Sequence, residues 1–246
     1  MFSFFKKKKP VFSGDLGIIG TDMHSHLLPG IDDGSPDIDT SIQLIEGLTA
    51  LGYKKFITTP HLMIDLYPNN RQTITSACNK LTAELEKRKM NVEIKAAAEY
   101  FLDDHFDSLL EKKEPLLTIK DNMVLVEFSF ASPPLDYKQK IFDIQMKGYK
   151  PILAHPERYG YFHSKPEVYD ELRHAGCFFQ VNLLSLIGYY GRGVQQTAER
   201  LFKKKQIELL GTDLHHERHL NNLQRPDLLQ KANEIANELP LLNAQL

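Results

Sequence analysis

The sequence predicts an α/β protein, folded as a closed and irregular barrel of seven parallel strands with seven helices. Short apolar or β-branched runs alternate with amphipathic segments along the chain, and Gly, Pro and Asn mark their boundaries. The runs are mostly continuous in their apolar character, which is typical of parallel strands covered by helices. No linker or shift in composition divides the 246 residues. A doubly wound open sheet is the rival arrangement.

Each predicted strand is a short run that stops at a turn residue or at a change to polar residues. In chain order the runs are LGIIGT at 16–21, KKFITT at 54–59, VEIKAAA at 92–98, MVLVEF at 123–128, PILA at 151–154, CFFQVN at 177–182 and IELLGT at 207–212. The amphipathic segments that follow predict helices over 38–51, 69–90, 103–113, 136–147, 165–175, 193–205 and 225–238. We expect one domain over residues 16–246, preceded by a basic arm over residues 1–15.

Composition argues against several classes of protein. The formal net charge of -2 and the pI near 6.6 provide no general basic field, so we expect no nucleic-acid partner. The two cysteines, Cys78 and Cys177, do not have the spacing of a disulfide framework or a zinc ribbon, which favours a cytoplasmic location. No run is apolar and long enough to cross a bilayer. Lys6–Lys9 are expected to be solvated, with weak contact to an anionic membrane surface as the alternative.

Histidine and carboxylate residues lie at or just past the carboxyl ends of six of the seven predicted strands. They are His24, His26, His61, Glu99, Glu127, His155, Asp213 and His215. Because the carboxyl ends of parallel barrel strands converge on one face, we expect these side chains to share one pocket. Taken singly, each has an ordinary explanation: Asp213 as a helix cap, Glu127 as the partner of a lysine, His61 as a turn residue. Their recurrence from strand to strand favours a common function.

The chemistry of these side chains indicates the kind of site. Histidine and carboxylate ligands without cysteine suit Mn, Fe or Zn better than a structural zinc cage. Imidazole combined with a bridging carboxylate is typical of hydrolytic sites with several metals. The residues therefore predict a binuclear or larger cluster of divalent ions.

Six motifs between residues 20 and 220 match a known family. They are DMHSHLLPGIDDGSPD at 22–37, TTPH at 58–61, AAEY at 97–100, LVEFS at 125–129, LAHPERY at 153–159 and GTDLH at 211–215. With them the chain resembles the PHP (polymerase and histidinol phosphatase) superfamily, and within it the bacterial tyrosine-protein phosphatases that accompany capsule or exopolysaccharide synthesis. The resemblance implies a distorted (β/α)7 TIM-like barrel, the PHP fold, that holds two to three divalent ions, with manganese favoured over iron or zinc. It also implies hydrolysis of phosphotyrosine by a metal-bound hydroxide.

The resemblance assigns roles to individual residues. The family's metal ligands match His24, His26, Asp33, His61, Glu99, Glu127, His155, Asp213 and His215. Glu99 would bridge two metals, and Asp33 would lie near the third. Arg158 matches the arginine that binds the substrate phosphate, so Arg158 and Asp33 are the predicted catalytic residues. Arg218 and Tyr159 join Arg158 as predicted substrate-binding residues, although Arg218 lies earlier than the family's arginine and Tyr159 equally well packs the barrel rim.

Charge supports a phosphate substrate independently of the family. Three dications carry more positive charge than the carboxylates of the predicted site return, which leaves a surplus for a phosphate dianion. A cysteine-dependent phosphatase is excluded, because an arginine is needed six positions after the nucleophile and Glu84 and Leu183 stand there after Cys78 and Cys177.

Three functions from different classes remain. The leading one is a metal-dependent phosphotyrosine phosphatase that acts on the tail of a bacterial tyrosine autokinase. The second is another PHP hydrolase, either a phosphomonoesterase such as histidinol phosphatase or a nuclease. The third is a regulator that keeps the barrel and has lost the chemistry.

Overall fold

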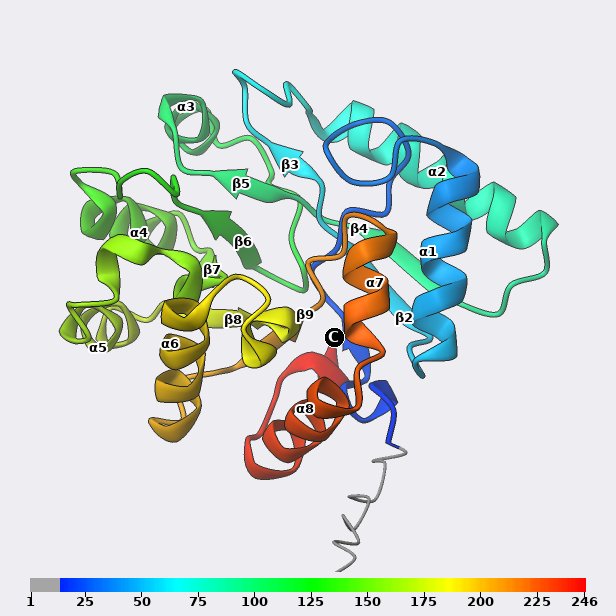
Figure 1. Ribbon diagram of the computed structural model, residues 1–246. Helices are drawn as coiled ribbons and strands as arrows, with labels where there is room; N and C mark the ends of the chain where they lie inside the picture. The colour runs from blue at the N-terminus through cyan, green and yellow to red at the C-terminus, as the bar shows by residue number, and fades with distance from the viewer. Residues whose placement is uncertain (1–13) are drawn as a thin grey trace, which may run out of the picture.

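The computed structural model describes residues 14–246, which form a parallel α/β barrel (Figure 1). The predicted basic arm, including Lys6–Lys9, falls almost entirely outside the described residues. One sheet of the barrel has the order β1 (Thr21–Asp22), β2 (Lys55–Thr58) and β4 (Glu93–Ala96). The other has the order β3 (His61–Leu62), β5 (Glu99–Phe101), β6 (Met123–Glu127), β7 (Lys150–Ala154), β8 (Phe178–Asn182) and β9 (Leu209–Gly211).

Two of the predicted strands pass from one sheet to the other, and this joins the sheets. The run 54–59 forms β2, and after Pro60 the chain continues as β3. Pro60 has no N–H to offer a ladder, but its carbonyl accepts a hydrogen bond from the backbone N–H of Glu99 at 3.1 Å. The run 92–98 likewise ends as β4 and resumes as β5. Glu99 therefore starts a new strand at the point where the two sheets meet.

The barrel closes between its first and last strands. Ser25, just past β1, forms a parallel bridge with Leu214, just past β9. The backbone N–H of His26 donates to the carbonyl of Leu214 at 2.9 Å, and that of Asp213 donates to the carbonyl of His24 at 2.8 Å. The closed barrel is thus confirmed, and the open sheet is wrong.

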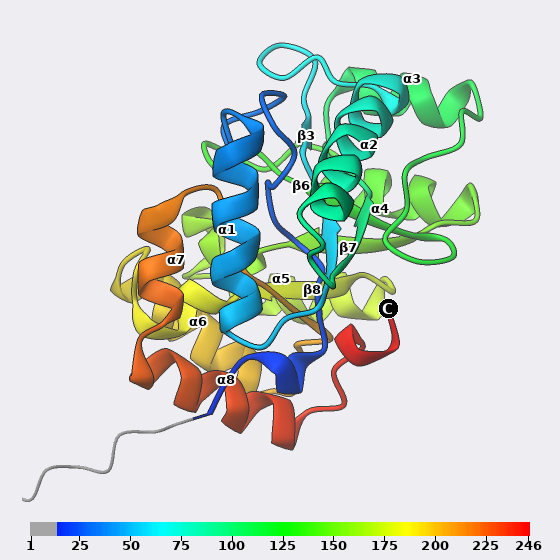
Figure 2. The ribbon, with the colours of Figure 1, turned by 90° about the vertical axis from the view of Figure 1, so that its right-hand side faces the viewer.

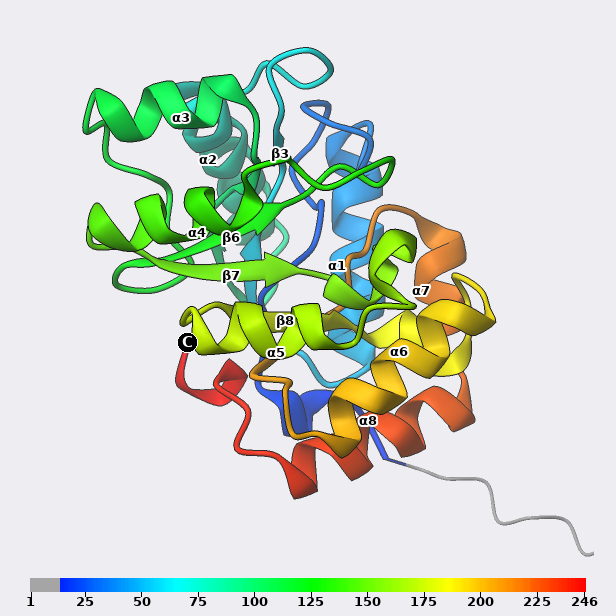
Figure 3. The same cartoon turned by 90° about the vertical axis from the view of Figure 1, so that its left-hand side faces the viewer.

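Helices alternate with the strands along the chain and surround the barrel. They are α1 (Ile38–Ala50), α2 (Arg71–Lys87), α3 (Asp104–Glu111), α4 (Tyr137–Met146), α5 (Glu167–His174), α6 (Arg192–Lys203), α7 (Glu217–Leu223) and α8 (Pro226–Glu238). α1, α2 and α7 cover one side (Figure 2), and α4, α5 and α6 cover the other (Figure 3). Across residues 14–246 no helix has the length and apolar character needed to cross a membrane.

Two details differ from the sequence-based expectation. The predicted strand 16–21 begins as a 3₁₀ helix over Gly17–Ile19, and only its last residue belongs to β1. Gly20 has a φ of 91°, and a Cβ there would lie 2.9 Å from the Cα of Ala244, so the chain turns where a strand was expected. α7 was not predicted, because its seven residues are too few for an apolar period to be recognised.

The interior of the barrel supports the strand ends. Successive residues of a strand point to opposite faces, so Leu125 and Glu127 of β6 lie on the same face. Leu125 is fully buried and belongs to a small apolar cluster of residues that lie in the strands or beside them: Met23, Ile57, Ala97, Ile119, Met123, Leu125, Ile152, Ala154 and Leu209. This packing fixes the strands beneath the polar residues at their ends.

Candidate metal centre

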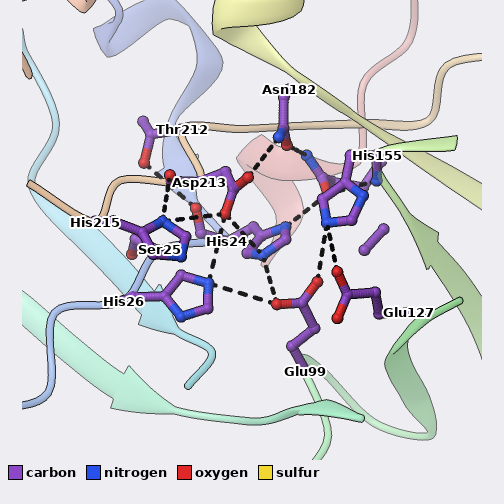
Figure 4. Close-up of polar contacts among 12 residues, drawn as sticks. His24, Ser25, His26, Glu99, Glu127, His155, Asn182, Thr212, Asp213 and His215 are labelled. Carbon is purple, nitrogen blue, oxygen red and sulfur yellow. Dashed lines mark hydrogen bonds and ion pairs between the residues drawn. The ribbon is translucent and has the colours of Figure 1, made fainter. Parts of the chain in front are cut away.

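The histidine and carboxylate residues at the strand ends converge on one pocket, as the close-up shows for most of them (Figure 4). The pocket has a volume of about 260 Å³ and is lined by Asp33, His61, Glu127, Phe130, His155, Arg158, Tyr190, Asp213, His215, His216 and His219. A larger, open depression of about 940 Å³ over α2 is lined by none of the predicted site residues. The chemistry therefore lies in the smaller pocket.

Glu99 lies at the centre of the cluster. Its Oε2 is 3.1 Å from Nδ1 of His61, 3.3 Å from Nε2 of His24 and 3.5 Å from Nε2 of His26. Its Oε1 is 3.1 Å from Nε2 of His155. One buried carboxylate thus faces four imidazoles that come from three different strand positions, which is the placement that a bridging ligand requires.

Four groups of side chains bring ligand atoms within 4.8 Å of one another. The groups are His26, Asp33, His61 and His215; His24, His26 and Asp213; His24, Glu99 and His155; and His61, Glu99 and Glu127. Because His24, His26, His61 and Glu99 each belong to two groups, the groups form one continuous cluster. All nine predicted ligand residues lie in it.

Unpartnered polar atoms test whether this cluster suits metal ions. Nε2 of His24, Nε2 of His26, Nδ1 of His61 and Oε2 of Glu99 are buried without a hydrogen-bond partner among the described residues. They approach one another at 3.1–3.5 Å without the geometry of hydrogen bonds. Buried polar atoms are costly when unpaired, and metal ions would satisfy all four. The donor set fits divalent ions.

The outer nitrogen of His24 is held by a chain of buried amides. Nδ1 of His24 lies 2.7 Å from Oε1 of Gln180, and Nε2 of Gln180 donates to Oδ1 of Asn182 at 2.9 Å. Nδ2 of Asn182 in turn donates to Oδ2 of Asp213 at 2.6 Å. The acceptor on Nδ1 leaves Nε2 of His24 free of a proton when the ring is neutral, as a metal ligand requires.

His26 is oriented by Asp32, which sequence reasoning did not include among the site residues. Nδ1 of His26 lies 2.8 Å from Oδ2 of Asp32, and the backbone N–H of His61 donates to the same oxygen at 3.1 Å. Burial raises the pKa of Asp32, but the attraction of His26 outweighs it and lowers that pKa to about 2. The loop needs Gly34 for this approach, since a Cβ there would lie 2.2 Å from the carbonyl oxygen of His26.

Burial and neighbouring charges shift the pKa values of the clustered side chains. Burial raises the pKa of Glu99, but His24 and His61 outweigh it and hold the pKa well below its usual range. Burial lowers the pKa of His26, but Asp32 and the other carboxylates outweigh it and hold the pKa well above its usual value. The pKa of Glu127 is raised well above its usual value by burial and by the charges of Glu99 and Asp213. The carboxylates at the centre thus attract positive charge strongly.

The backbone bends sharply at two of the strand ends. His155 has a φ of 33° and Asp213 a φ of 50°, in the left-handed region that residues other than glycine seldom adopt. His155 directly follows β7, and Asp213 lies two residues past β9. Such backbone strain persists where the surrounding structure enforces it. Here the side chain of His155 faces Glu99, and that of Asp213 faces His24.

Arg158 lies at the mouth of the pocket. Its Nη1 donates to Oδ2 of Asp213 at 2.8 Å, and its Cζ lies 4.6 Å and 4.3 Å from the ring centroids of Phe130 and Tyr190. The guanidinium is therefore held by one carboxylate and two aromatic rings. Its remaining N–H groups are available to a ligand in the pocket.

Two predicted substrate-binding residues lie outside the pocket. Tyr159 is fully buried, and its hydroxyl donates to the carbonyl of Ala154 and accepts from the N–H of Phe128. The prediction that its ring contacts a substrate is wrong, because no surface of the ring is open; it packs the barrel rim. Arg218 is exposed on α7 with its guanidinium over Tyr189, and it does not line the pocket.

Several pocket residues were missed by sequence reasoning. Phe130, Tyr190, His216 and His219 line the pocket, while Gln180 and Asn182 lie behind it. The glutamine and asparagine lie within the predicted strand 177–182, but neither has the ligand chemistry that marked the other strands. Phe130 directly follows the motif LVEFS at 125–129, but its side chain has no polar group that would indicate a site residue.

Comparison with known proteins extends this picture. The family model described as capsular polysaccharide synthesis, CpsB/CapC, matches residues 20–239. Tyrosine-protein phosphatase YwqE of Bacillus subtilis is 29% identical over 229 residues, which cover 92% of this chain and 90% of that protein. Tyrosine-protein phosphatase CpsB of Streptococcus agalactiae is 27% identical over 237 residues, which cover 91% and 96% of the two chains.

Solved structures agree with the family match. A chain from the crystal structures of YwqE from Bacillus subtilis and CpsB from Streptococcus pneumoniae, described as unique metal-dependent tyrosine phosphatases, matches with a TM-score of 0.76 at 26% identity. The match covers 90% of this chain and 96% of that one. A histidinol phosphate phosphatase from Lactococcus lactis, solved with zinc, L-histidinol and phosphate, matches with a TM-score of 0.52 at 16% identity, which shows a shared fold.

Proposed function

The chain belongs to the CpsB/CapC family of capsular polysaccharide synthesis, and on this premise we propose that it is a metal-dependent protein-tyrosine phosphatase. The observation that carries the proposal is the continuous cluster of imidazoles and carboxylates beneath Arg158. The curated relatives that match over nine-tenths of the chain are named tyrosine-protein phosphatases.

The nine clustered residues are the proposed ligands of two to three divalent ions, with manganese favoured over iron or zinc. Glu99 is the proposed bridging ligand, because both of its oxygens face imidazoles. Asp33 joins His61 and His215, from which its Oδ1 lies 3.5 Å in each case, and it closes the cluster on the pocket side. When bound, divalent ions would neutralise the phosphate and lower the pKa of water toward about 7, so that hydroxide is available to attack phosphorus.

The chain's own residues prepare the phosphate for this attack. Arg158 binds phosphate oxygens with the N–H groups that Asp213 does not use, and its guanidinium is fixed before the substrate arrives. Glu99, His24 and His26 are buried completely, so bulk water does not screen the charges that hold the phosphate. The leaving phenolate, with an ordinary pKa of about 10, makes little demand on a proton donor.

The proposed substrate is the phosphorylated tyrosine tail of a bacterial tyrosine kinase that regulates capsule or exopolysaccharide synthesis. The family description supports the link to capsule synthesis. The pocket supports a protruding residue of this kind, since a volume of about 260 Å³ admits one side chain rather than a folded surface. A cytoplasmic location follows from such a partner.

The test is a substrate panel with the purified full chain, stripped of metal and then loaded with Mn²⁺. The substrates are a phosphotyrosine peptide, histidinol phosphate and single-stranded DNA. We expect the peptide to be hydrolysed with the highest kcat/KM and activity to disappear on removal of the metal. Preference for histidinol phosphate or cleavage of DNA would replace this function by another hydrolase activity, and inactivity on all three would indicate a regulator.

A further inference from the structure

Phe130 is unusual among the residues that line the pocket. It lies three residues past Glu127, in the connection between β6 and α4, and its side chain is 49% exposed. Of the described pocket residues it is the one with a purely apolar side chain; the others carry carboxylate, imidazole, guanidinium or phenol groups. An apolar ring therefore stands at the edge of a strongly polar cavity.

The position of Phe130 is fixed by two site residues. Its ring is stacked on that of His155, with 5.4 Å between centroids and an angle of 24° between planes. The Cζ atom of Arg158 lies 4.6 Å from its centroid. With these contacts the residue still stays 49% exposed, beside the group proposed to bind phosphate.

A bound aryl phosphate would place its ring close to this open surface. The ester oxygen joins phosphorus directly to the ring, so a phosphate held by Arg158 brings the ring within the range of about 4.5–7 Å at which aromatic pairs interact. Covering the exposed part of Phe130 would also remove apolar surface from water. Tyr159 has no open surface, so it does not compete for this contact.

We propose that Phe130 contacts the aromatic ring of the substrate and makes the site selective for aryl over alkyl phosphates. The inference rests on the proposed phosphatase function and adds the residue that recognises the substrate class. Serine and threonine phosphates carry no ring and make no such contact. Metal ions and Arg158 bind the phosphate of either class, so discrimination has to come from a group that contacts the ester substituent.

A positioning role is the competing explanation. Phe130 contacts Arg158 and His155, so its removal disturbs the phosphate site as well. A positioning role predicts the same loss for every phosphate ligand, whereas ring recognition predicts a loss confined to aryl ligands. The ratio between an aryl and an alkyl ligand therefore separates the two explanations.

The experiment measures binding of phenylphosphonate and methylphosphonate to the Mn²⁺-loaded full chain, both as inhibition constants and by calorimetry. Wild type is expected to bind phenylphosphonate about tenfold more tightly than methylphosphonate. Phe130→Ala should remove this preference, and Phe130→Trp should keep it. Leu135→Ala is the matched control, since Leu135 is fully exposed in the same connection and does not line the pocket.

Each outcome decides the question. An unchanged ratio in Phe130→Ala, or equal affinity for both ligands in wild type, overturns the inference. Failure of the proposed function is seen separately, because a wild-type chain that binds phenylphosphonate but does not hydrolyse phosphotyrosine peptide contradicts the phosphatase and leaves the aryl contact standing. Calorimetry reports binding even where a variant has no turnover.

Discussion

Arg158 and Asp213 form a charged hydrogen bond of 2.8 Å between Nη1 and Oδ2, while Oδ1 of Asp213 faces His24 and His26 at 3.4 Å and 3.5 Å. One carboxylate thus connects the arginine at the pocket mouth to the histidine cluster. Because Asp213 is held on both sides, the guanidinium stays in place without substrate. Arg158 is not itself a proposed metal ligand, so its part in phosphate binding can be tested apart from metal binding.

Replacement of Arg158 by Ala should lower kcat/KM on phosphotyrosine peptide by about 100- to 1,000-fold, because a preorganised donor to the phosphate is lost. Arg158→Lys should recover little of it, since an ammonium group lacks the planar fork of N–H groups. Metal content and the circular dichroism spectrum should stay as in wild type. The matched control is Arg218→Ala, exposed on α7, which should retain activity. A greater loss in Arg218→Ala than in Arg158→Ala would reverse the assignment.

The pattern of ligand-type residues at strand ends was sufficient to predict which residues gather, since a parallel barrel brings its strand ends together whatever the exact boundaries. For this reason the interruptions of two predicted strands, at Pro60 and before Glu99, did not affect the prediction of the site. The residues that support the ligand histidines were not predicted. Asp32 supports His26 from the same connection between β1 and α1, and Gln180 supports His24 from β8, a contact that no spacing along the chain encodes. For Tyr159 the sequence left substrate contact and rim packing as equal alternatives, because its motif position reveals proximity and not burial.

Replacement of Glu99 by Gln should cause loss of bound metal. Both oxygens of Glu99 face imidazole nitrogens at 3.1 Å, so the amide offers one weaker acceptor and no negative charge in place of a bridge. We expect a fall of at least one metal ion per chain in elemental analysis, together with loss of turnover. Glu93→Gln is the control, because Glu93 is an exposed residue of β4. Full metal content in Glu99→Gln would exclude a bridging role.

Replacement of Gln180 by Leu should weaken metal binding by about 10- to 100-fold, the usual effect of removing the partner of a ligand histidine. The change leaves Nδ1 of His24 without its acceptor at 2.7 Å and also breaks the link to Asn182. Titration of the metal-free chain with Mn²⁺ measures the affinity. At saturating Mn²⁺ the KM for substrate should return to the wild-type value, and a persistent defect there would argue for a direct role of Gln180 in substrate binding.

Metal binding should release protons from the clustered side chains. The pKa of His26 is raised well above its usual value, because Asp32 and other carboxylates outweigh burial, and the pKa of Glu127 is raised by burial and by Glu99. Both shifts favour the protonated form in the metal-free protein, and incoming cations displace such protons. Because protons compete with the metal ions, the affinity for Mn²⁺ should rise with pH, by about tenfold per pH unit for each proton displaced. Calorimetric titration with Mn²⁺ in buffers of different ionisation enthalpy counts the protons, and identical heats in all buffers would contradict the expectation.

Replacement of Asn243 by Ala should destabilise the barrel by about 3 kcal/mol, because three buried backbone groups lose their partner. Its side chain accepts a hydrogen bond from the N–H of Leu210 at 2.9 Å and donates to the carbonyls of Leu210 and Thr21 at 2.7 Å and 2.9 Å. The residue thus ties β9 to β1 beneath the bridge between Ser25 and Leu214.

Urea unfolding of the metal-free chain measures this effect as a fall in the midpoint at unchanged slope. Gln245→Ala serves as the control, since Gln245 lies exposed in the same C-terminal segment. His24 and Asp213 lie just past the two strands that Asn243 joins, so the Asn243 variant should also bind Mn²⁺ more weakly. Lower stability with unchanged affinity would mean that the backbone hydrogen bonds just past β1 and β9 hold His24 and Asp213 in place without the contacts of Asn243.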